Sequence, residues 1–457
     1  ECHCNKGWWG VDCSEGGNRS AAVKENGASP RIYVYDLPHE WTSGVIRHLR
    51  ADNAYCIPRR YSSAGIASSG NAYQGQVFLH EKFLRSHHRT FDGSLADYYF
   101  IPLWSLCTKR TYDHSRGLLA NLDYVKTRWP YWNATGGQRH MIVMPDDMGA
   151  CDLSPKALAA LGGAMVLQHN GDTTIQGPLK KLLPGGHGWG TRRGCHIRGR
   201  DIVLPPAVGS RYGSKWDLIQ APFEKARRQG AVRNWTFFFV GTVKLPGSAG
   251  YSGGVRDMVF QYYANESTFN MVDIRKNRLN PLNMGLNYLT SKFCLAPSGQ
   301  GWGIRAVIAI FYGCIPVVIQ DHISMPYDEY LPWDQFSIRL HSTQIPQMRE
   351  ILNAVSDAKL LELQRALSCV WSRFQWTSLF GMFRPIGEDG NVPGPDAFDT
   401  LMELLRERLQ HQHQPNASMQ LTSACGDTQI GQGEAERTRK PLCLFPCAPG
   451  IGDPSES

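Results

Sequence analysis

The feature that most constrains the fold is a strand, glycine-rich loop, helix and strand pattern at residues 291–321, SKFCLAPSGQGWGIRAVIAIFYGCIPVVIQD. An apolar run at 293–296 is short enough for one buried strand, and it breaks at Pro297 into a loop that carries three glycines. Apolar residues at helical spacing then predict a helix that ends at Gly313, before a second buried strand at 315–319. The pattern predicts a β–α–β unit of a parallel sheet.

The loop of this unit has the chemistry of a phosphate-binding site. Backbone N–H groups of a glycine-rich loop can approach an anion closely, and a helix N-terminus adds partial positive charge. Arg305 lies in the first turn of the predicted helix, where an anionic ligand would explain a cation. Asp321 follows the second strand, where a carboxylate can bind ribose hydroxyls. The loop residues predicted to contact the phosphate are Ser298, Gly299, Gly301 and Gly303.

An ordinary surface loop with a solvated Arg305 is the alternative that the spacing leaves open. The third glycine falls one residue too early for the dinucleotide-binding fingerprint, so the loop alone does not identify the ligand. Motifs elsewhere in the chain are needed to distinguish a phosphate-binding loop from an ordinary surface loop.

A series of motifs, in one order along the chain, carries a family resemblance. The longest runs from SKFCLAPSGQGWG through Arg305 and GCIPVVI to MPYDEYLPWDQFSI. The others are ADYYFIPLW, PYWNATGG followed by DDMG, RDIVLPP, FFFVGTV with Arg256 downstream, and DAFD. Together they resemble the exostosin family, glycosyltransferase family 47, which includes the heparan sulfate polymerases and many plant cell-wall glycosyltransferases. The resemblance covers about residues 30–410.

The resemblance implies an α/β fold of the GT-B type, in which two Rossmann-like domains face each other across a cleft. The acceptor is then expected mostly on the first domain and the nucleotide sugar mostly on the second. The expected divisions are a partial EGF-like module at 1–14, a linker at 15–29, an acceptor domain at 30–234, a nucleotide-sugar domain at 235–394, a helix returning to the first domain at 395–411, and a tail at 412–457.

The alternation of apolar strands and amphipathic helices independently favours parallel sheets covered by helices. Strands are predicted at 31–35, 98–101, 141–144 and 237–240, and helices at 74–87, 255–263 and 396–409. The glycine- and proline-rich region at 162–194 is predicted to be a long irregular insertion.

The chemistry of glycosyl transfer assigns roles to particular residues. The reaction needs a base for the acceptor hydroxyl and positive charge for the departing diphosphate. Arg256 matches a family arginine and is the second phosphate candidate, a surface arginine being the alternative. Asp147 follows a predicted strand and is the favoured base, although such a carboxylate equally often caps a helix, and Glu81 is the reserve. Trp302 in the loop is a candidate for stacking on a sugar ring.

The sequence therefore predicts a hexosyl- or pentosyltransferase, inverting as the resemblance implies, that moves a sugar from a nucleotide sugar, preferably a UDP-sugar, to a glycan or glycoprotein. No metal and no other cofactor is expected, since there is no Asp-x-Asp pair to carry a divalent ion. Ile308 stands where family members usually carry an acidic residue, and DDMG lacks the histidine and tryptophan that they often show. The alternative is therefore a glycan-binding or scaffolding protein without catalysis on the same fold.

The cysteines and the glycosylation sequons indicate an oxidising compartment. ECHCNKGWWGVDC at the start resembles the last third of an EGF-like module. The cysteines expected to close this module are Cys4 and Cys13, plausible pairs elsewhere are Cys151 with Cys195 and Cys443 with Cys447, and Cys294 and Cys314 are expected to be thiols in the core. The N-x-Ser/Thr sequons are at Asn18, Asn133, Asn234, Asn265 and Asn416.

The composition and the family resemblance together predict the compartment and the partners. At 457 residues, with 42% hydrophobic and 19% charged residues, the chain is globular rather than disordered. Its formal charge of +8 is modest and no nucleic-acid-binding motif is present, so nucleotide sugars and glycans are the expected partners. The resemblance implies the Golgi lumen, with a type II membrane anchor upstream of this chain, or else secretion or display at the cell surface.

Overall fold

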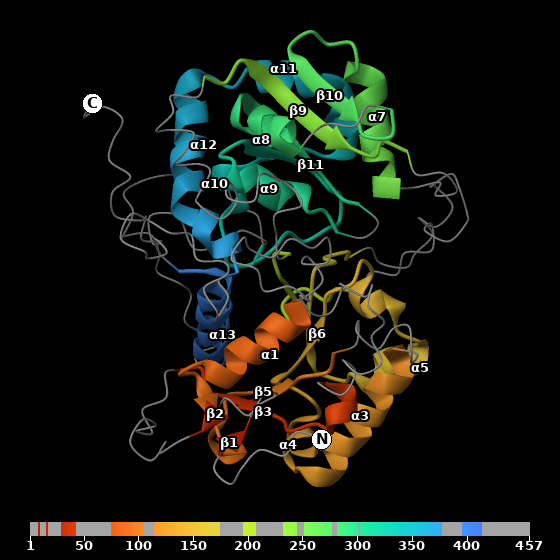
Figure 1. Ribbon diagram of the computed structural model, residues 1–457, viewed down its shortest axis with the longest axis vertical. Coiled ribbons are helices and arrows are strands. Elements are labelled where there is room, and N and C mark those ends of the chain that lie inside the picture. Colours follow the sequence, from red (N-terminus) through yellow and green to blue (C-terminus); the bar gives the residue numbers. More distant parts are fainter. Residues whose placement is uncertain are drawn as a thin grey trace, which may run out of the picture.

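The computed structural model describes residues 8–9, 15–16, 29–42, 75–104, 114–173, 195–206, 232–244, 251–276, 281–299, 302–376 and 395–413. These residues form two α/β domains, the N-terminal one below the C-terminal one in Figure 1, and each domain is built on a parallel sheet. The predicted α/β class with two parallel-sheet domains is therefore confirmed.

The N-terminal domain contains a sheet of six parallel strands in the order β4-β3-β5-β6-β7-β8. The strands are β3 (Ile32–Val34), β4 (Arg89–Thr90), β5 (Tyr98–Ile101), β6 (His140–Met144), β7 (Met165–Gln168) and β8 (Ile202–Val203). The helices are α1 (Gly75–Arg85), α3 (His114–Arg128), α4 (Tyr131–Thr135) and α5 (Pro155–Ala160). The expectation of an irregular insertion at 162–194 was wrong in its first part, because β7 is a fully buried strand inside this sheet.

The central strands of this sheet, β5, β6 and β7, are buried along their whole length because helices cover both faces. In β5, Tyr98 and Phe100 belong to the core that continues into the C-terminal domain, while Tyr99 and Ile101 belong to a second core on the opposite face. Alternate residues of a strand point to opposite faces, so each of the four finds an apolar neighbourhood.

The C-terminal domain contains five parallel strands in the order β10-β9-β11-β12-β13. The strands are β9 (Trp235–Gly241), β10 (Phe269–Asp273), β11 (Ser291–Pro297), β12 (Ile315–Ile319) and β13 (Ile338–Arg339). The helices are α7 (Val255–Tyr263), α8 (Pro281–Leu289), α9 (Arg305–Phe311), α10 (Trp333–Phe336), α11 (Met348–Asn353) and α12 (Asp357–Val370). The strand, helix and strand predicted from 291–321 are thus confirmed as β11, α9 and β12.

Both sheets have the same strand order when their strands are numbered along the chain, namely 2-1-3-4-5, with β8 added to the N-terminal sheet. This is the flavodoxin-like variant of the doubly wound fold. The chain crosses from one side of the sheet to the other between the first and third strands, which are β9 and β11 in the C-terminal domain. Ligands of such sheets bind beyond the carboxyl ends of these two strands.

A long C-terminal helix, α13 (Ala397–His413), packs beside α1 of the N-terminal domain (Figure 1). Lys82 pairs with Asp396 at 3.2 Å just before α13 begins, and the rings of Phe83 and Phe398 meet edge to face. Farther along the helix, the hydroxyl of Tyr98 donates to its backbone.

Two disulfides lie within the described residues, one in each domain. Cys151 and Cys195 are joined as predicted. Cys294 and Cys314 are also joined, so the expectation that they are core thiols was wrong. Cys294 lies in β11 and Cys314 directly precedes its neighbour β12, which brings their Cα atoms to 5.8 Å. A sequence does not reveal this pairing, because it depends on which strands are neighbours.

At the N-terminus the structure describes a two-stranded antiparallel pair, β1 (Trp8–Trp9) with β2 (Glu15–Gly16). Cys4, Cys13, Cys443, Cys447, Asn18 and Asn416 lie outside the described residues, so the EGF-like module stays a prediction. Asn133, Asn234 and Asn265 are exposed. Within the described part of the chain, no helix has both the length and the apolar character needed to span a membrane.

Candidate functional site at the meeting of two sheet edges

The carboxyl edges of the two sheets are joined by backbone contacts between the segments that follow β7 and β12. Asp172 and Ile323 form an antiparallel bridge, and the N–H of Ser324 donates to the carbonyl of Gly171 at 2.9 Å. A Cβ at Gly171 would lie 2.1 Å from the carbonyl oxygen of Ser324, so only glycine allows this approach. The carboxyl edges of both sheets, where folds of this type bind ligands, therefore meet.

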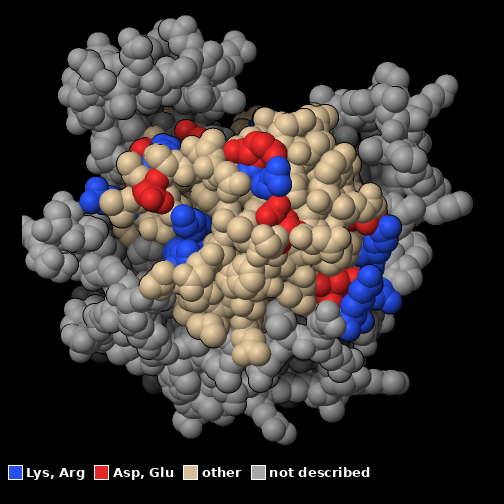
Figure 2. Space-filling view, turned by 90° about the horizontal axis from the view of Figure 1, so that it is seen from above, with Lys and Arg blue, Asp and Glu red and all other residues tan. Residues whose placement is uncertain are grey.

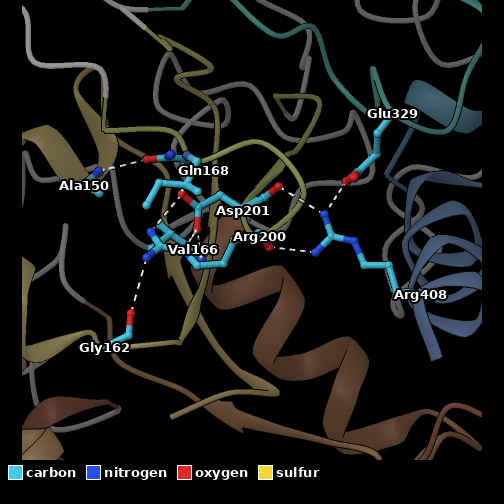
Figure 3. A network of polar contacts seen from close by, with 9 residues as sticks. Ala150, Gly162, Val166, Gln168, Arg200, Asp201, Glu329 and Arg408 are labelled. Carbon is cyan, nitrogen blue, oxygen red and sulfur yellow. Dashed lines mark hydrogen bonds and ion pairs between the residues drawn. The ribbon is translucent and has the colours of Figure 1, made fainter. Parts of the chain in front are cut away.

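A second connection holds the domains together at the side of this junction (Figure 3). The guanidinium of Arg408 on α13 donates to the carbonyls of Arg200 and Asp201 in the N-terminal domain, and it pairs with Glu329 of the C-terminal domain. The Asp201 carboxylate is itself fixed by the N–H of Val166 in β7. Burial raises the pKa of Glu329, while the charge of Arg408 opposes this rise. The network fixes α13, and through it the C-terminal domain, beside the end of the N-terminal sheet.

The glycine-rich loop follows β11 and has a tight backbone path. The N–H of Gly299 donates to the carbonyl of Trp302 at 2.9 Å, which closes the loop on itself. A Cβ on Gly303 would lie 2.2 Å from the carbonyl oxygen of Pro297, and one on Gly299 would lie 2.9 Å from that of Trp302. The two glycines are therefore required by the shape of the loop. Gly301 lies outside the described residues.

Arg256 holds this loop in place. It is 5% exposed and lies in the first turn of α7. Its Nε and Nη2 donate to the carbonyl of Ser298 at 3.0 and 2.8 Å, and its Nη1 donates to the carbonyl of Thr242 and the hydroxyl of Tyr251. Burial lowers the pKa of Arg256 to about 10, and the charge of Arg305 acts in the same direction. Arg256 thus holds the predicted phosphate loop in position through the carbonyl of Ser298. That Arg256 also contacts a phosphate directly stays a prediction.

Arg305 lies at the predicted switch point of the sheet. It is the first residue of α9 and is half-buried, and its Nε donates to the carbonyl of Val240 in β9 at 2.8 Å. This bond holds the guanidinium beside the end of β9, the neighbour of β11 in the sheet. Two arginines therefore converge on the loop after β11 from different helices.

Asp321 and Ile308 have surroundings that the sequence did not reveal. Asp321 lies just beyond β12, where its carboxylate accepts from the N–H of Ser342 at 3.1 Å and lies 3.4 Å from Nε2 of His341. It therefore anchors the turn that begins after β13, and its role at a ribose stays a prediction. Ile308 is fully buried in the apolar core of the C-terminal domain.

Both predicted carboxylate bases lie in the N-terminal domain, and only Asp147 follows the end of a strand. Asp147 is half-buried, three residues past the end of β6, and Glu81 is half-buried in α1. It is the neighbouring Asp146 that caps the turn there, since its Oδ1 accepts from the N–H groups of Met148 and Gly149. The capping alternative thus falls on Asp146.

The structure adds one residue at this junction that the sequence analysis missed. His169 directly follows β7 and is 4% exposed, and its ring centroid lies 5.1 Å from that of Trp302 in the loop of the opposite domain. The signal was the short apolar stretch at the start of Met165–Gln168, a run that His169 directly follows. It was overlooked because glycines and prolines on both sides of the run predicted irregular structure.

One group of side chains among the described residues has the composition of a metal site. His114, Asp146 and Asp152 bring their ligand atoms within 4.8 Å of one another, with Asp152 exposed. His114 Nδ1 lies 3.6 Å from Asp146 Oδ2. The expectation that no metal is needed stays a prediction.

Comparisons with known proteins identify the family. The Exostosin GT47 domain model matches residues 26–355. A probable glucuronosyltransferase of Oryza sativa subsp. japonica is 25% identical over 74% of this chain and 74% of its own. A probable glucuronoxylan glucuronosyltransferase of Arabidopsis thaliana is 26% identical over 74% of this chain and 66% of its own. A probable beta-1,4-xylosyltransferase of the same plant is 24% identical over 74% of each chain.

Proposed function

Because the chain belongs to the exostosin GT47 family, we propose that it is a glycosyltransferase that moves a sugar from a nucleotide-sugar donor to a glycan or glycoprotein acceptor. The relatives named as glucuronosyl- and xylosyltransferases support transfer of a sugar in general, and their names make UDP-glucuronic acid and UDP-xylose the first donors to test. The proposed reaction is inverting and needs no metal.

The observation that carries this proposal is the loop after β11, held at the point where the strand order of the C-terminal sheet reverses. Ser298, Gly299 and Gly303 shape a backbone surface that a diphosphate can approach, and Arg305 supplies charge beside it. As the bond from the sugar to the diphosphate breaks, negative charge develops on the leaving group, and the guanidinium stabilises it.

The acceptor is proposed to lie on the facing edge, in the N-terminal domain. Asp147 and Glu81 are the carboxylates that the sequence suggests for taking the acceptor proton. Trp302, which belongs to the donor loop yet contacts His169 of the N-terminal domain, lies where the transferred sugar would pass between the two edges.

A second candidate function is a glycan-binding or scaffolding protein that has lost catalysis. Ile308 favours it, since the family usually carries an acidic residue at this position and here the side chain is fully buried among apolar residues. In this case a donor would bind weakly or not at all, and no sugar would be transferred.

The compartment proposed for this protein is the Golgi lumen, where a type II anchor upstream of this chain would hold it. Family membership, two disulfides and three exposed sequon asparagines support an oxidising compartment with glycosylation.

The test is donor binding by the secreted, glycosylated protein. UDP-glucuronic acid, UDP-xylose and other UDP- and GDP-sugars are titrated in the presence of EDTA, and the melting temperature and the heat of binding are measured. At least one donor is expected to stabilise the fold, and Arg305→Ala is expected to abolish this effect. Binding that EDTA removes would contradict the metal-independent form of the proposal.

A matched control is Arg349→Ala. Arg349 lies in α11, where its guanidinium pairs with Glu266 and Glu350. Its backbone N–H donates to the hydroxyl of Tyr263, which lies at the end of α7 opposite to Arg256. In a view from this side of the C-terminal domain, basic and acidic side chains are interspersed among uncharged ones (Figure 2). Because Arg349 lies at the end of α7 far from Arg256 and the donor loop, Arg349→Ala should leave donor binding intact. If no donor binds to a well-folded wild type, the non-catalytic alternative is favoured instead.

A further inference from the structure

We propose that His169 is a positioning residue for the donor loop, the glycine-rich loop that follows β11. Its ring holds the indole of Trp302 and thereby fixes the shape in which the loop binds a diphosphate. The inference rests on the proposed glycosyltransferase function, and it adds that the acceptor domain takes part in donor binding. It is carried by the contacts that fix His169, by its contact with Trp302, and by the hydrogen bond with which Trp302 closes the loop.

His169 has a fixed orientation within its own domain. It directly follows β7 and is 4% exposed. Its Nδ1 lies 3.0 Å from the carbonyl oxygen of Leu204, and because a carbonyl only accepts hydrogen bonds, Nδ1 is the donor. Another edge of the ring packs against the start of α1, since a Cβ built on Gly75 would lie 3.7 Å from Nε2. The ring is therefore held in one position.

The chain that follows His169 is bonded to the C-terminal domain. The N–H of Ser324 donates to the carbonyl of Gly171, and the N–H of Thr173 donates to the carbonyl of His322, both at 2.9 Å. These bonds begin only two residues after His169. His169 therefore has a defined place relative to the C-terminal domain, to which the donor loop belongs.

At this place the ring of His169 contacts Trp302. The two ring centroids are 5.1 Å apart and the ring planes are inclined by 52°. Aromatic rings at such a separation attract each other beyond the effect of the area that they bury. Trp302 is half-buried. Its indole is thus held by the N-terminal domain, although its backbone belongs to the donor loop.

The backbone of Trp302 carries this contact into the loop. Its carbonyl accepts from the N–H of Gly299 at 2.9 Å, which closes the loop. The start of the loop is held separately, because the carbonyl of Ser298 accepts from Arg256 and from the hydroxyl of Ser252. One end of the loop therefore depends on the C-terminal domain and the other on His169. A binding surface fixed before the ligand arrives loses less entropy on binding, so loss of the His169 contact should weaken diphosphate binding.

The test measures the affinity of His169 and Trp302 variants for UDP by calorimetry, with GDP as a second probe. UDP carries the diphosphate but no sugar, so a loss of affinity cannot come from lost stacking of Trp302 on a sugar ring. His169→Asn keeps an amide that can donate to the carbonyl of Leu204 but removes the ring. His169→Phe keeps a ring but loses that donor. Trp302→Leu removes the partner ring.

His169→Asn is expected to bind UDP about tenfold more weakly than the wild type, and Trp302→Leu to show a loss of similar size. The double variant is expected to bind no more weakly than either single variant, because His169 acts through Trp302. His169→Phe is expected to keep its affinity within about threefold of the wild type. Its melting temperature should nevertheless fall, since the carbonyl of Leu204 loses its donor.

His88→Asn is the matched control. His88 is also 4% exposed and its Nδ1 lies 2.9 Å from the carbonyl oxygen of Pro30, but it precedes β4 at the opposite edge of the sheet. This variant is expected to keep the UDP affinity of the wild type. If His169→Asn also keeps it, or if the losses in the double variant add up, His169 does not position the loop. A well-folded wild type that binds neither nucleotide would overturn the proposed function and this inference with it, whereas the two preceding results leave the proposed function standing.

Hydrogen exchange at Gly299 reports on the loop itself. Its amide is expected to exchange faster in His169→Asn and in Trp302→Leu, and at the rate of the wild type in His88→Asn. A general loss of stability would not confine the change to this loop. Trp302→Leu replaces a half-buried loop residue and provides the test if His169→Asn does not fold. Unchanged exchange at Gly299 in Trp302→Leu would overturn the proposal.

Discussion

The two sheet edges that meet in this protein are built by different means. In the C-terminal domain, the edge is a backbone surface: Arg256 binds carbonyls, and Gly299 and Gly303 leave no room for side chains. In the N-terminal domain, the edge presents side chains, with Asp146 capping a turn and His169 fixed by a carbonyl. The difference matches a division of labour in which one edge binds an anion with fixed donors and the other exchanges a proton.

The largest expected difference between the domains appears in acid. Burial lowers the pKa of His80 to about 3 and those of His140 and His196 to about 4, and all three belong to the N-terminal domain. Because the folded pKa lies below the unfolded one, the stabilisation is complete above pH 6.5 and is lost as pH falls towards 4. Each histidine then removes about 1.4 kcal/mol per pH unit from the free energy of unfolding.

Hydrogen exchange read by mass spectrometry at pH 7 and pH 4.5, corrected for intrinsic rates, checks this expectation. Strands β5 and β6 should lose protection before β9 and β11 do. Equal loss in both sheets, or earlier loss in the C-terminal sheet, would show that the buried histidines do not set the acid response.

The second largest effect is expected from replacing Arg256, which holds the backbone of the loop at the C-terminal edge. Arg256→Ala removes the guanidinium donors to the carbonyls of Thr242 and Ser298, of which Ser298 keeps only the Ser252 hydroxyl, and we expect a loss of about 3 kcal/mol in the free energy of unfolding. Urea denaturation measures it. Arg256→Lys keeps the charge but loses the planar set of guanidinium donors. Its free energy of unfolding should therefore lie between that of the wild type and that of Arg256→Ala. A stable Arg256→Ala protein that has lost only donor binding would instead identify Arg256 as a direct phosphate ligand.

A smaller difference in stability is expected between alanine substitutions at two glycines, one from each edge. Gly303→Ala places a Cβ 2.2 Å from a backbone oxygen and should destabilise the protein by about 2 kcal/mol, since backbone atoms must move. Gly75→Ala places its Cβ 3.7 Å from the nearest atom, so its melting temperature should match that of the wild type. Thermal unfolding of the two variants checks the contrast, and similar costs at both positions would refute the account of how the edges differ.

The sequence was most informative where local periodicity and composition determine structure. The β11, α9 and β12 unit was predicted because its apolar residues have strand and helix periods and its breaks are marked by proline and glycine. Helix α7 has the bounds that were predicted for it.

What the sequence did not predict depends on contacts between distant residues. Strand β7 was missed because the four residues that form it lie among turn-forming ones, and only pairing with β6 and β8 fixes them. His169 was missed with it. The bond between Cys294 and Cys314 follows from strand adjacency, and the role of Arg256 follows from the carbonyls that it reaches, neither of which a linear pattern contains.

The most direct test of the central claim is a crystal structure of this protein with UDP bound. We predict that the diphosphate lies beyond the ends of β9 and β11, within hydrogen-bond distance of Arg305 and the backbone of residues 298–303. Its terminal phosphate should point towards Trp302 and His169. UDP bound at another edge, or only at the N-terminal sheet, would contradict the assignment of the two edges.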